Sequence, residues 1–443
     1  MPSLTPDLLA KFAAGFHADA ANAIRQRAVV KMGIDAAAEN HRAEIECPMV
    51  FSLELKDTGK VTDQKASGRC WLFAALGTMR YEVIHRLDLD DFELSQNYLM
   101  FWDKLEKANA FLDSMVEFAG EPTDSRPVTF LMARSARDGG QWDMYAALAD
   151  KYGCVPKSTM QETFHSSNSA EMNQLLSRKL AEDTAELRAA ARGGAPAGEI
   201  AALKGRMLQE IYTFLAICLG EPPAKFDFEY RGKDGGFHRD AGLTPKTFFR
   251  KYVGLRLSDY VSVVNAPTAD KPFGKTYTIA HMGNVIGGRP IKYLNLPFAD
   301  LRQLALAQLA DGKPVWFGCD FGQMCLRDKG HMTAGTFDYK AATGLDFAFC
   351  KNRRIDYRMV ESTHAMVLLG VNLADGKPNR WKVENSFGKG SGRDGYFVMT
   401  DDWFAEYGFQ LVVDKKYFTP AQRKAFRQPP VILAPWDTLR DTL

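Results

Sequence analysis

The amino-acid sequence predicts an α+β fold in which a helical first half precedes a β-rich second half. Residues 60–165 contain long stretches with apolar residues at helical spacing. Residues 166–260 are rich in helix-forming residues, which predicts a mainly helical segment. From about residue 261 to 415, short apolar runs bounded by turn residues predict strands. We expect a functional site in the cleft where the two halves meet.

The N-terminal residues 1–59 are expected to form a helical cover or assembly segment. Leu8, Phe12 and Phe16 recur at the spacing of one helix face. The segment lacks the basic-then-apolar pattern of a secretory signal, and no run in the chain approaches the roughly 18 apolar residues of a membrane span. We therefore expect a cytoplasmic protein without membrane partners.

Bulk composition agrees with an ordinary globular protein. The 443 residues are 46% hydrophobic and 25% charged, and this length favours two or three domains. The net charge of +2 gives no reason to expect polyanionic partners. The short basic clusters at 351–354 and 415–416 are expected to be solvated surface, so nucleic-acid binding is unlikely. Seven widely spaced cysteines, an odd number, favour a reducing compartment over a disulfide framework.

Cys70 is the first candidate for chemistry. It opens the apolar-periodic run that continues from Trp71 to Ile84, so it is expected in the first turn of a helix. The positive end of the helix dipole and the unsatisfied backbone N–H groups there favour a thiolate, which is the nucleophilic form of cysteine. A free cysteine is more commonly a small apolar residue of the core. The residues around it decide for the nucleophile.

A cysteine nucleophile needs a base and a group that orients the base. Among eight histidines, His364 is the one followed at short range by a convincing orienting residue. It begins an apolar run, and a second run from Trp381 to Gly388 follows the turn at 374–379, which predicts a hairpin. A hairpin brings the start of its first strand beside the end of its second. Asn385 could then accept the imidazole N–H and leave the other ring nitrogen facing Cys70.

Gln64, six residues before Cys70, is the fourth candidate. Its side-chain amide could donate to the oxyanion that forms during acyl transfer, a role worth several kcal/mol. Taken alone, His364 could be an ordinary strand histidine and Asn385 a turn residue. Four suitable residues in this order favour catalysis.

With these residues the chain resembles the papain-like cysteine peptidases, and within them the bleomycin hydrolase / aminopeptidase C family. The resemblance spans roughly residues 50–443 and rests on Asp63 to Ala74 with its core Ser67-Gly68-Arg69-Cys70-Trp71, on Gly139-Gly140-Gln141-Trp142, on Thr363-His364-Ala365-Met366, on Glu384-Asn385-Ser386 and on Ala434-Pro435-Trp436-Asp437. It implies a papain-like catalytic unit of a helical half and a β half, with Cys70 as nucleophile, His364 as general base, Asn385 as its orienting residue and Gln64 in the oxyanion hole.

The spacing of the site requires a large insertion. His364 follows Cys70 by 294 residues, whereas papain-type enzymes keep the two about 130–150 residues apart. Residues 170–191 and 199–219 both have helical composition and period, and the Gly- and Pro-containing break at 193–198 separates them, which predicts a helical hairpin. The resemblance implies that such inserted helices help to build a ring-like homo-oligomer, here expected to be a homohexamer.

We divide the chain accordingly. The expected segments are the N-terminal cover (1–59), the helical half (60–165), the insertion (166–260), the β half (261–430) and a C-terminal arm in the cleft (431–443).

The resemblance also implies how substrate is bound. The backbone of Gly139 and Gly140 would pair with the peptide, although Asp138-Gly139-Gly140 is equally an ordinary turn sequence. The terminal carboxylate of Leu443 would hold the free amino group of the substrate. Such a pair about 4 Å apart gains roughly 4 kcal/mol at an effective dielectric constant of ~20, before desolvation is deducted. The arm would also block longer chains, so that residues are released from the amino end.

Two departures from the family pattern stand out. Residues 438–442 differ from the usual arm and add Arg440 and Asp441, and a terminus is often frayed. Phe387 stands where the family has Trp shielding the Asn–His hydrogen bond. We expect phenylalanine to shield it with a smaller area, without loss of activity.

Two competing motifs are set aside. Residues 390–395 match the dinucleotide fingerprint G-x-G-x-x-G, but a strand and not a helix follows, so we expect a hairpin turn and no cofactor. Cys319, Cys325 and His331 are regularly spaced, but Cys319 ends a buried strand and no paired cysteines complete a ligand set, so no metal site is expected.

The sequence therefore predicts a cytoplasmic thiol aminopeptidase that acts on peptides. Two alternatives remain open: an acyl-transfer amidase or transpeptidase on the same scaffold, and a non-enzymatic assembly protein that binds nucleic acid.

Overall fold

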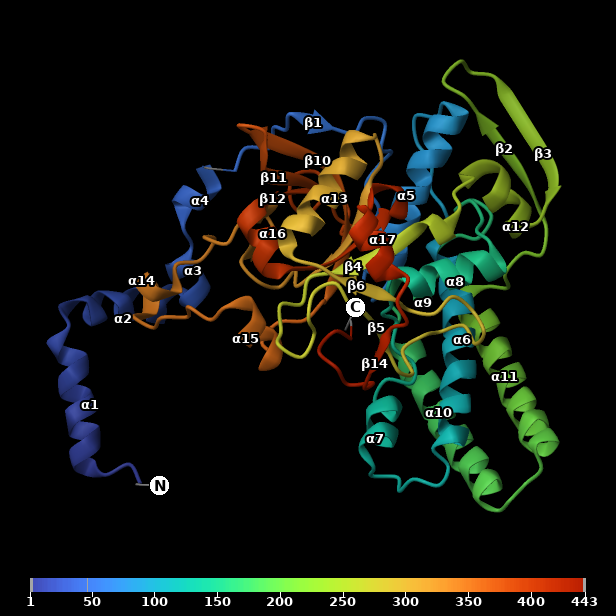
Figure 1. The fold of residues 1–443 in the computed structure, drawn as a ribbon, viewed down its shortest axis with the longest axis horizontal. Coiled ribbons are helices and arrows are strands. Elements are labelled where there is room, and N and C mark those ends of the chain that lie inside the picture. Colours follow the sequence, from blue (N-terminus) through green and yellow to red (C-terminus); the bar gives the residue numbers. More distant parts are fainter. Residues whose placement is uncertain (1–2, 46, 441–443) are drawn as a thin grey trace.

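The computed structural model describes residues 3–45 and 47–440. A large sheet and a layer of long helices lie side by side, and a short helical arm projects from the sheet side (Figure 1). This arrangement confirms the predicted α+β class.

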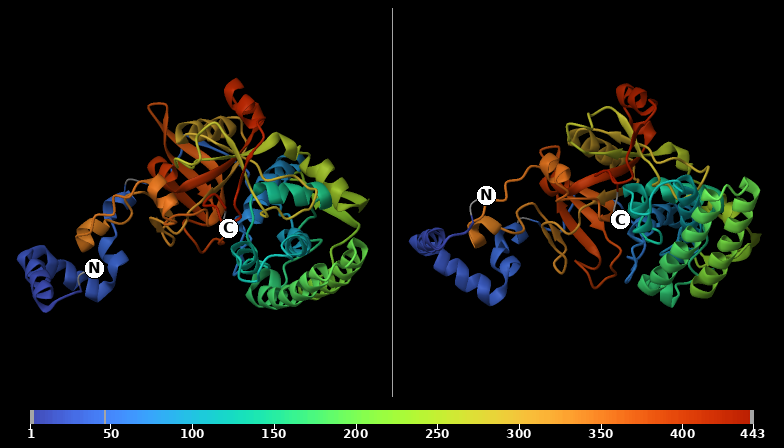
Figure 2. Two further views of the ribbon diagram at one scale, coloured as in Figure 1. Left: turned by 60° about the horizontal axis from the view of Figure 1, so that its bottom comes forward. Right: turned by 90° about the horizontal axis from the view of Figure 1, so that it is seen from below.

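The N-terminal helices form the projecting arm (Figures 1 and 2). They are α1 (Pro6–Ala18), α2 (Ala20–Met32), α3 (Ile34–Ala38) and α4 (His41–Ile45). No residue of α1, α2 or α4 is buried. The arm contacts α14 (Tyr339–Thr343), where Arg25 Nε donates to the Ala341 carbonyl at 3.0 Å and the Tyr339 hydroxyl donates to Asp35 at 3.0 Å.

The helical half is built around α5, which begins at Cys70 as predicted. Its helices are α5 (Cys70–Leu87), α6 (Gln96–Glu117), α7 (Arg126–Met132), α8 (Trp142–Tyr152) and α9 (Phe164–Ser167). Most of α5 is buried, with Trp71, Ala75 and Met79 fully enclosed. An apolar helix of this kind is stable only between other layers, here between α6 and α8 on one side and the sheet on the other.

The predicted helical hairpin is confirmed. Helices α10 (Ala170–Arg192) and α11 (Ala197–Leu219) lie along α6 (Figure 1). Leucines and methionines at three- and four-residue intervals form their buried faces. The hairpin β2 (Phe226–Arg231) and β3 (Phe237–Leu243) follows, then α12 (Pro245–Phe248) and a π-helical turn, Phe249–Val253. We did not predict this strand pair, although Phe226–Arg231 alternates aromatic and charged residues.

The β half is a twelve-stranded sheet in the order β14-β5-β6-β4-β13-β7-β10-β11-β12-β9-β8, with β1 also paired to β10. The strands are β1 (Leu53–Glu54), β4 (Tyr260–Val264), β5 (Thr276–Ile279), β6 (Tyr293–Asn295), β7 (Val315–Cys319), β8 (Cys325–Leu326), β9 (His331–Met332), β10 (His364–Ala374), β11 (Lys377–Glu384), β12 (Tyr396–Thr400), β13 (Gly408–Asp414) and β14 (Val431–Leu433). Its helices are α13 (Phe298–Ala310), α14, α15 (Lys351–Asp356), α16 (Asp401–Tyr407) and α17 (Pro420–Phe426), with 3-10 turns at Leu257–Asp259 and Lys415–Tyr417.

The predicted hairpin from His364 to the region of Asn385 is present as β10 and β11, which pair antiparallel. Helix α5 packs on β10, where the Gly77 position faces the Val367 side chain. The first turn of α5, the start of β10 and the end of β11 therefore lie at the boundary between the helical half and the β half. No helix within the described residues is long and apolar enough to cross a membrane.

Candidate active site

Cys70 lies at the N-terminus of α5 and is buried, with 3% of its surface exposed. The amides of Leu72 and Phe73 both donate to the Arg69 carbonyl, which closes the first turn. No side chain caps this end of the helix, and its first turn contains no acidic residue. The positive end of the helix dipole is therefore not neutralised locally, and it favours a negative charge on the sulfur.

His364 and Asn385 are in contact, as predicted. His364 Nε2 lies 2.8 Å from Asn385 Oδ1, which also accepts from the Ser386 amide at 2.7 Å. Because that oxygen can only accept, Nε2 must carry the proton in the neutral ring, and Nδ1 is left as the basic nitrogen. Both side chains are buried. The pair has the geometry of a base fixed in one tautomer by an amide.

Aromatic rings enclose the imidazole. The Phe387 ring stacks on His364 with centroids 4.8 Å apart, and Phe321 lies 5.1 Å away at a tilt. The guanidinium of Arg327 lies over both phenylalanine rings. Phe387 thus occupies the shielding position expected for it. Burial lowers the pKa of His364 to about 4, the Asn385 hydrogen bond opposes this, and the charge of Arg327 adds to it.

This pKa predicts an acid-tolerant enzyme. Because the base must be unprotonated, kcat/KM on a free-amine peptide substrate should fall only as the pH drops towards about 4, and not near the ordinary imidazole value of 6.5. Replacing Asn385 with aspartate places a negative charge beside the ring, which favours the imidazolium and should move this acid limb to higher pH. Steady-state rates between pH 3.5 and 7 measure both. An acid limb near 6.5 in the unaltered enzyme would contradict the inference.

Gln64 is held beside the Asn385 segment. The backbone N–H of Gln64 donates to the Ser386 carbonyl at 2.8 Å, and the Ser386 hydroxyl donates to the side-chain oxygen Gln64 Oε1 at 2.6 Å. Gln64 Nε2 donates one hydrogen to the Ser67 carbonyl at 2.6 Å and retains a second. Ser386, for which no role was predicted from the sequence, fixes the orientation of the Gln64 side-chain amide. Its place directly after Asn385 was the only signal for it.

Cys319 connects the two halves of the site. It is the residue of β7 that pairs directly with His364 of β10, so both side chains lie on the same face of the sheet. Burial raises the pKa of the Cys319 thiol, and the charge of Asp320 raises it further. On the helical side, Trp316 Nε1 of β7 donates to the Trp71 carbonyl at 3.2 Å.

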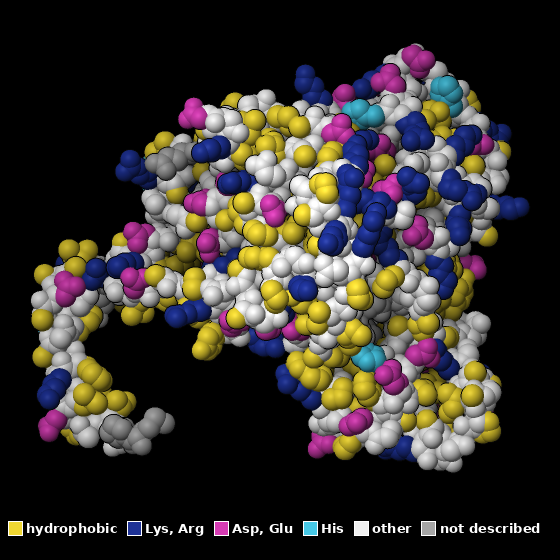
Figure 3. Space-filling model, viewed as in Figure 1, with side chains coloured by type: hydrophobic (Ala, Val, Ile, Leu, Met, Phe, Trp, Pro, Cys, Tyr) yellow, Lys and Arg dark blue, Asp and Glu magenta, His cyan; other side chains and the backbone are white. Residues whose placement is uncertain are grey.

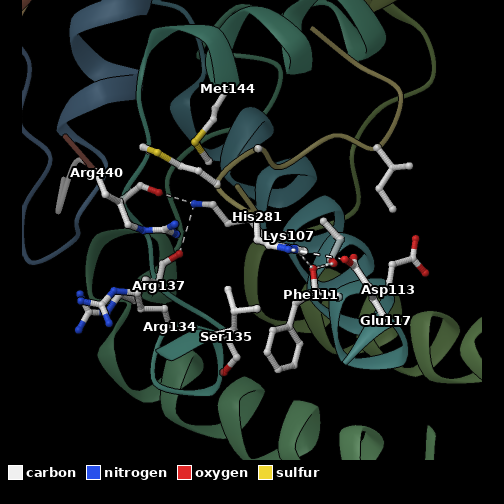
Figure 4. A pocket seen from close by; sticks show the side chains of 18 residues that line it. Lys107, Phe111, Asp113, Glu117, Arg134, Ser135, Arg137, Met144, His281 and Arg440 are labelled. Carbon is white, nitrogen blue, oxygen red and sulfur yellow. Dashed lines mark hydrogen bonds and ion pairs between the residues drawn. The ribbon is translucent and has the colours of Figure 1, made fainter. Parts of the chain in front are cut away.

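Gly139 and Gly140 line a cavity of about 330 Å³ (Figure 4). A side chain at Gly140 would meet the indole of Trp71 at 2.7 Å, so only glycine lets the backbone come this close to the residue after Cys70. The other walls come from α6, from α7 and the segment that follows it, from α8, from the segment after β5 and from Arg440. The lining combines apolar residues with charged residues at the rim, as in many ligand sites.

The C-terminal segment reaches this cavity. Strand β14 pairs parallel with β5, and Trp436 then packs under the Arg126 guanidinium of α7 at 4.2 Å. Arg358 donates to the Trp436 carbonyl at 2.8 Å. Leu439 is buried, and Arg440 lines the cavity. Leu443 lies outside the described residues.

The competing motifs have structural explanations. Residues 390–395 form the turn before β12, as expected, and Cys319 ends the buried strand β7. Among the described residues, no three His, Cys, Asp or Glu side chains are grouped to hold a metal ion.

Comparison with known proteins gives consistent matches over the whole chain. The model of the Peptidase C1-like family matches residues 3–440. Aminopeptidase C of Streptococcus thermophilus is 46% identical over 99% of both chains, and aminopeptidase C of Listeria monocytogenes is 47% identical over 98% of both. The crystal structure of pepw from Lactobacillus rhamnosis superimposes with a TM-score of 0.97 at 47% identity, covering 99% of this chain and 98% of that one.

Proposed function

The chain belongs to the Peptidase C1-like family, a papain-like cysteine peptidase group, and on this premise we propose that it is an aminopeptidase that removes residues from the free amino end of peptides. The names of the relatives support the activity. The position of Arg440 supports the amino-end specificity, because the chain's own C-terminal segment enters the cavity lined by Gly139 and Gly140.

We propose the following roles. His364 Nδ1 takes the Cys70 proton, and the thiolate attacks the carbonyl carbon of the first peptide bond. Gln64 Nε2 and backbone N–H groups at the start of α5 stabilise the oxyanion. The imidazolium then gives its proton to the leaving amine, and a thioester to Cys70 remains. His364 next removes a proton from water, which hydrolyses the thioester and releases the amino acid. Asn385 holds the ring in place throughout.

The substrate's position follows from the same proposal. The backbone at Gly139 and Gly140 pairs with the bound chain, and the carboxylate of Leu443 holds the substrate ammonium group. Arg440 lines the cavity and is three residues from that carboxylate, and three residues span at most about 10 Å.

Deleting residues 441–443 tests the proposed role of the C-terminal arm in binding substrate. The truncated enzyme should lose at least about tenfold in kcat/KM on free-amine aminoacyl amides, because the charge that binds the ammonium group is lost. It should also begin to cleave N-acetylated peptides, because the block is removed. A variant extended by one glycine is the matched control, since it keeps the arm but displaces the carboxylate. If N-acetylated peptides stay uncut and free-amine peptides are unaffected, the arm has no such role.

The five-segment division and the homohexamer remain proposals. Support for self-association comes from the N-terminal helices α1 and α2, where Leu9, Phe12 and Val30 are exposed. Apolar side chains are visible along these helices in Figure 3. We propose a cytoplasmic location because the seven widely spaced cysteines favour a reducing compartment. Amidase or transpeptidase action is the second candidate, because the same thioester could pass to an amine in place of water.

A further inference from the structure

Asp138, the residue before Gly139, binds groups from three separate segments. Its carboxylate accepts from the Gly68 amide at 2.9 Å, from Asn173 Nδ2 at 2.8 Å and from the Ser169 hydroxyl, and it forms an ion pair with Lys104 at 2.6 Å. Gly68 lies two residues before Cys70, Lys104 belongs to α6, and Ser169 and Asn173 lie at the start of the inserted helix α10.

The main chain at Asp138 extends the same network. The Asp138 carbonyl accepts from Trp71 Nε1 at 3.0 Å and from Lys107 Nζ at 3.2 Å. Lys107, which lines the cavity in Figure 4, also donates to the Gly139 carbonyl. Asp138 thus binds Gly68 before Cys70 and Trp71 after it, and it is joined directly to Gly139, whose backbone is proposed to bind substrate.

The Asp138–Lys104 ion pair is tightly enclosed. The Lys104 side chain is 1% exposed and that of Asp138 8%. Burial alone would raise the pKa of the Asp138 carboxyl, but Lys104, Ser169 and the Gly68 amide together hold it below its usual range. A Cβ at Gly68 would lie 2.9 Å from the Asp138 Cβ, so the approach is as close as glycine permits. Removal of the carboxylate would leave a buried cation unpaired.

A second buried contact holds the residue next to the nucleophile. Arg69, 1% exposed, forms an ion pair with Glu162 at 2.7 Å, and its Nε donates to the Ser67 hydroxyl at 2.9 Å. The Ser169 amide donates to the Ala66 carbonyl at 3.3 Å. Residues 66–69 are therefore fixed from the insertion side as well as from α6.

We propose that Asp138 is a positioning residue for Cys70. Its hydrogen bonds connect the first turn of the inserted helix α10 to residues 66–69, which form the catalytic loop before Cys70. This inference rests on the proposed role of Cys70 as nucleophile. The carboxylate does not touch the reacting atoms. It holds the Gly68 amide, and so the entry into α5, in the position that keeps the sulfur at the helix N-terminus and in line with substrate.

The test compares Asp138→Ala and Asp138→Asn with the matched control Glu106→Gln. Glu106 is a buried acid like Asp138, but it lies in α6 and pairs with Lys151 and Tyr152, away from residues 66–69. Each variant is assayed for kcat and KM on a free-amine substrate. Alkylation of Cys70 by iodoacetamide is followed by peptide mass spectrometry from pH 4 to 8, and thermal unfolding is recorded in parallel.

We expect Asp138→Ala to lower kcat by about 10²-fold, the usual effect of a displacement near 1 Å, with KM changed less than about threefold. Its alkylation should slow across the pH range, because the sulfur moves off the helix end. Asp138→Asn keeps an acceptor for Gly68 and should retain more activity. Glu106→Gln should lose thermal stability but keep the kcat and alkylation profile of the unaltered enzyme.

Three outcomes would overturn the inference: an unchanged kcat and alkylation profile in folded Asp138→Ala, equal slowing in Glu106→Gln, or no recovery in Asp138→Asn. If Asp138→Ala does not fold, Asn173→Ala removes one hydrogen bond without an unpaired charge, and it should show the same slowing of alkylation on a smaller scale. Failure of the proposed function is distinguished separately, because the alkylation rate of Cys70 reports the position of its sulfur whether or not the protein hydrolyses peptides.

Discussion

Replacing Cys70 with alanine should reduce hydrolysis of free-amine peptide amides by about 10⁴- to 10⁶-fold, because the covalent step has no other nucleophile. Other thiols cannot replace it. Burial raises the pKa of the Cys154 and Cys319 thiols, and raises that of Cys325 to about 12, so these sulfurs stay protonated near neutral pH. Steady-state rates and labelling by a thiol-reactive inhibitor, located by peptide mass spectrometry, measure the loss.

The exposed Cys350 provides the control. Cys350→Ser should keep full turnover and lose only the labelling of its own peptide. Turnover or inhibitor labelling that persists unchanged in Cys70→Ala would refute the assignment.

Replacing His364 with alanine should have the second largest effect, a loss of about 10³- to 10⁵-fold in kcat/KM. In the proposed mechanism the ring is the proton acceptor, and the Nε2–Asn385 hydrogen bond fixes its orientation. When two residues act in the same catalytic step, the losses of rate caused by replacing each one do not multiply in the double variant. The Cys70→Ala/His364→Ala double variant should therefore be no slower than Cys70→Ala alone.

Kinetics of the two single variants and the double variant give this comparison directly. Losses that multiply in the double variant would mean that the two residues act independently, which a shared proton transfer does not allow. Circular dichroism must first show that each variant is folded, because His364 is buried between Phe321 and Phe387.

Much of the fold could be predicted because the informative patterns are local. The start of α5 at Cys70 follows from an apolar helical period that begins there, and the β10–β11 hairpin follows from two apolar runs around a turn. The hairpin of α10 and α11 follows from composition and a Gly–Pro break. The pair β2–β3 was missed although β2 alternates aromatic and charged residues, because β3 is largely exposed and shows no such alternation.

The supporting contacts of the site could not be predicted in the same way. Asp138 and Gly68 are 70 residues apart in sequence, and Arg327 lies over Phe387 from a distant loop. Such contacts depend on how the halves pack, and a single sequence carries no periodic signal for them. His364 and Asn385 were accessible because a hairpin fixes their separation. The catalytic roles of Gln64, Cys70, His364 and Asn385 stay predictions, as do the substrate-binding roles of Gly139, Gly140 and Leu443.

The two ends of the chain differ in what can be attached to them. An affinity tag or fusion partner joined after Leu443 would begin three residues beyond Arg440, at the wall of the cavity that holds Gly139 and Gly140. In the proposed mechanism a linker there would compete with the bound peptide for this cavity. Helix α1 projects away from α6 and α8, whose residues line the cavity (Figure 1), so a tag joined ahead of α1 would begin far from it. Recombinant production for the assays above should use the latter arrangement.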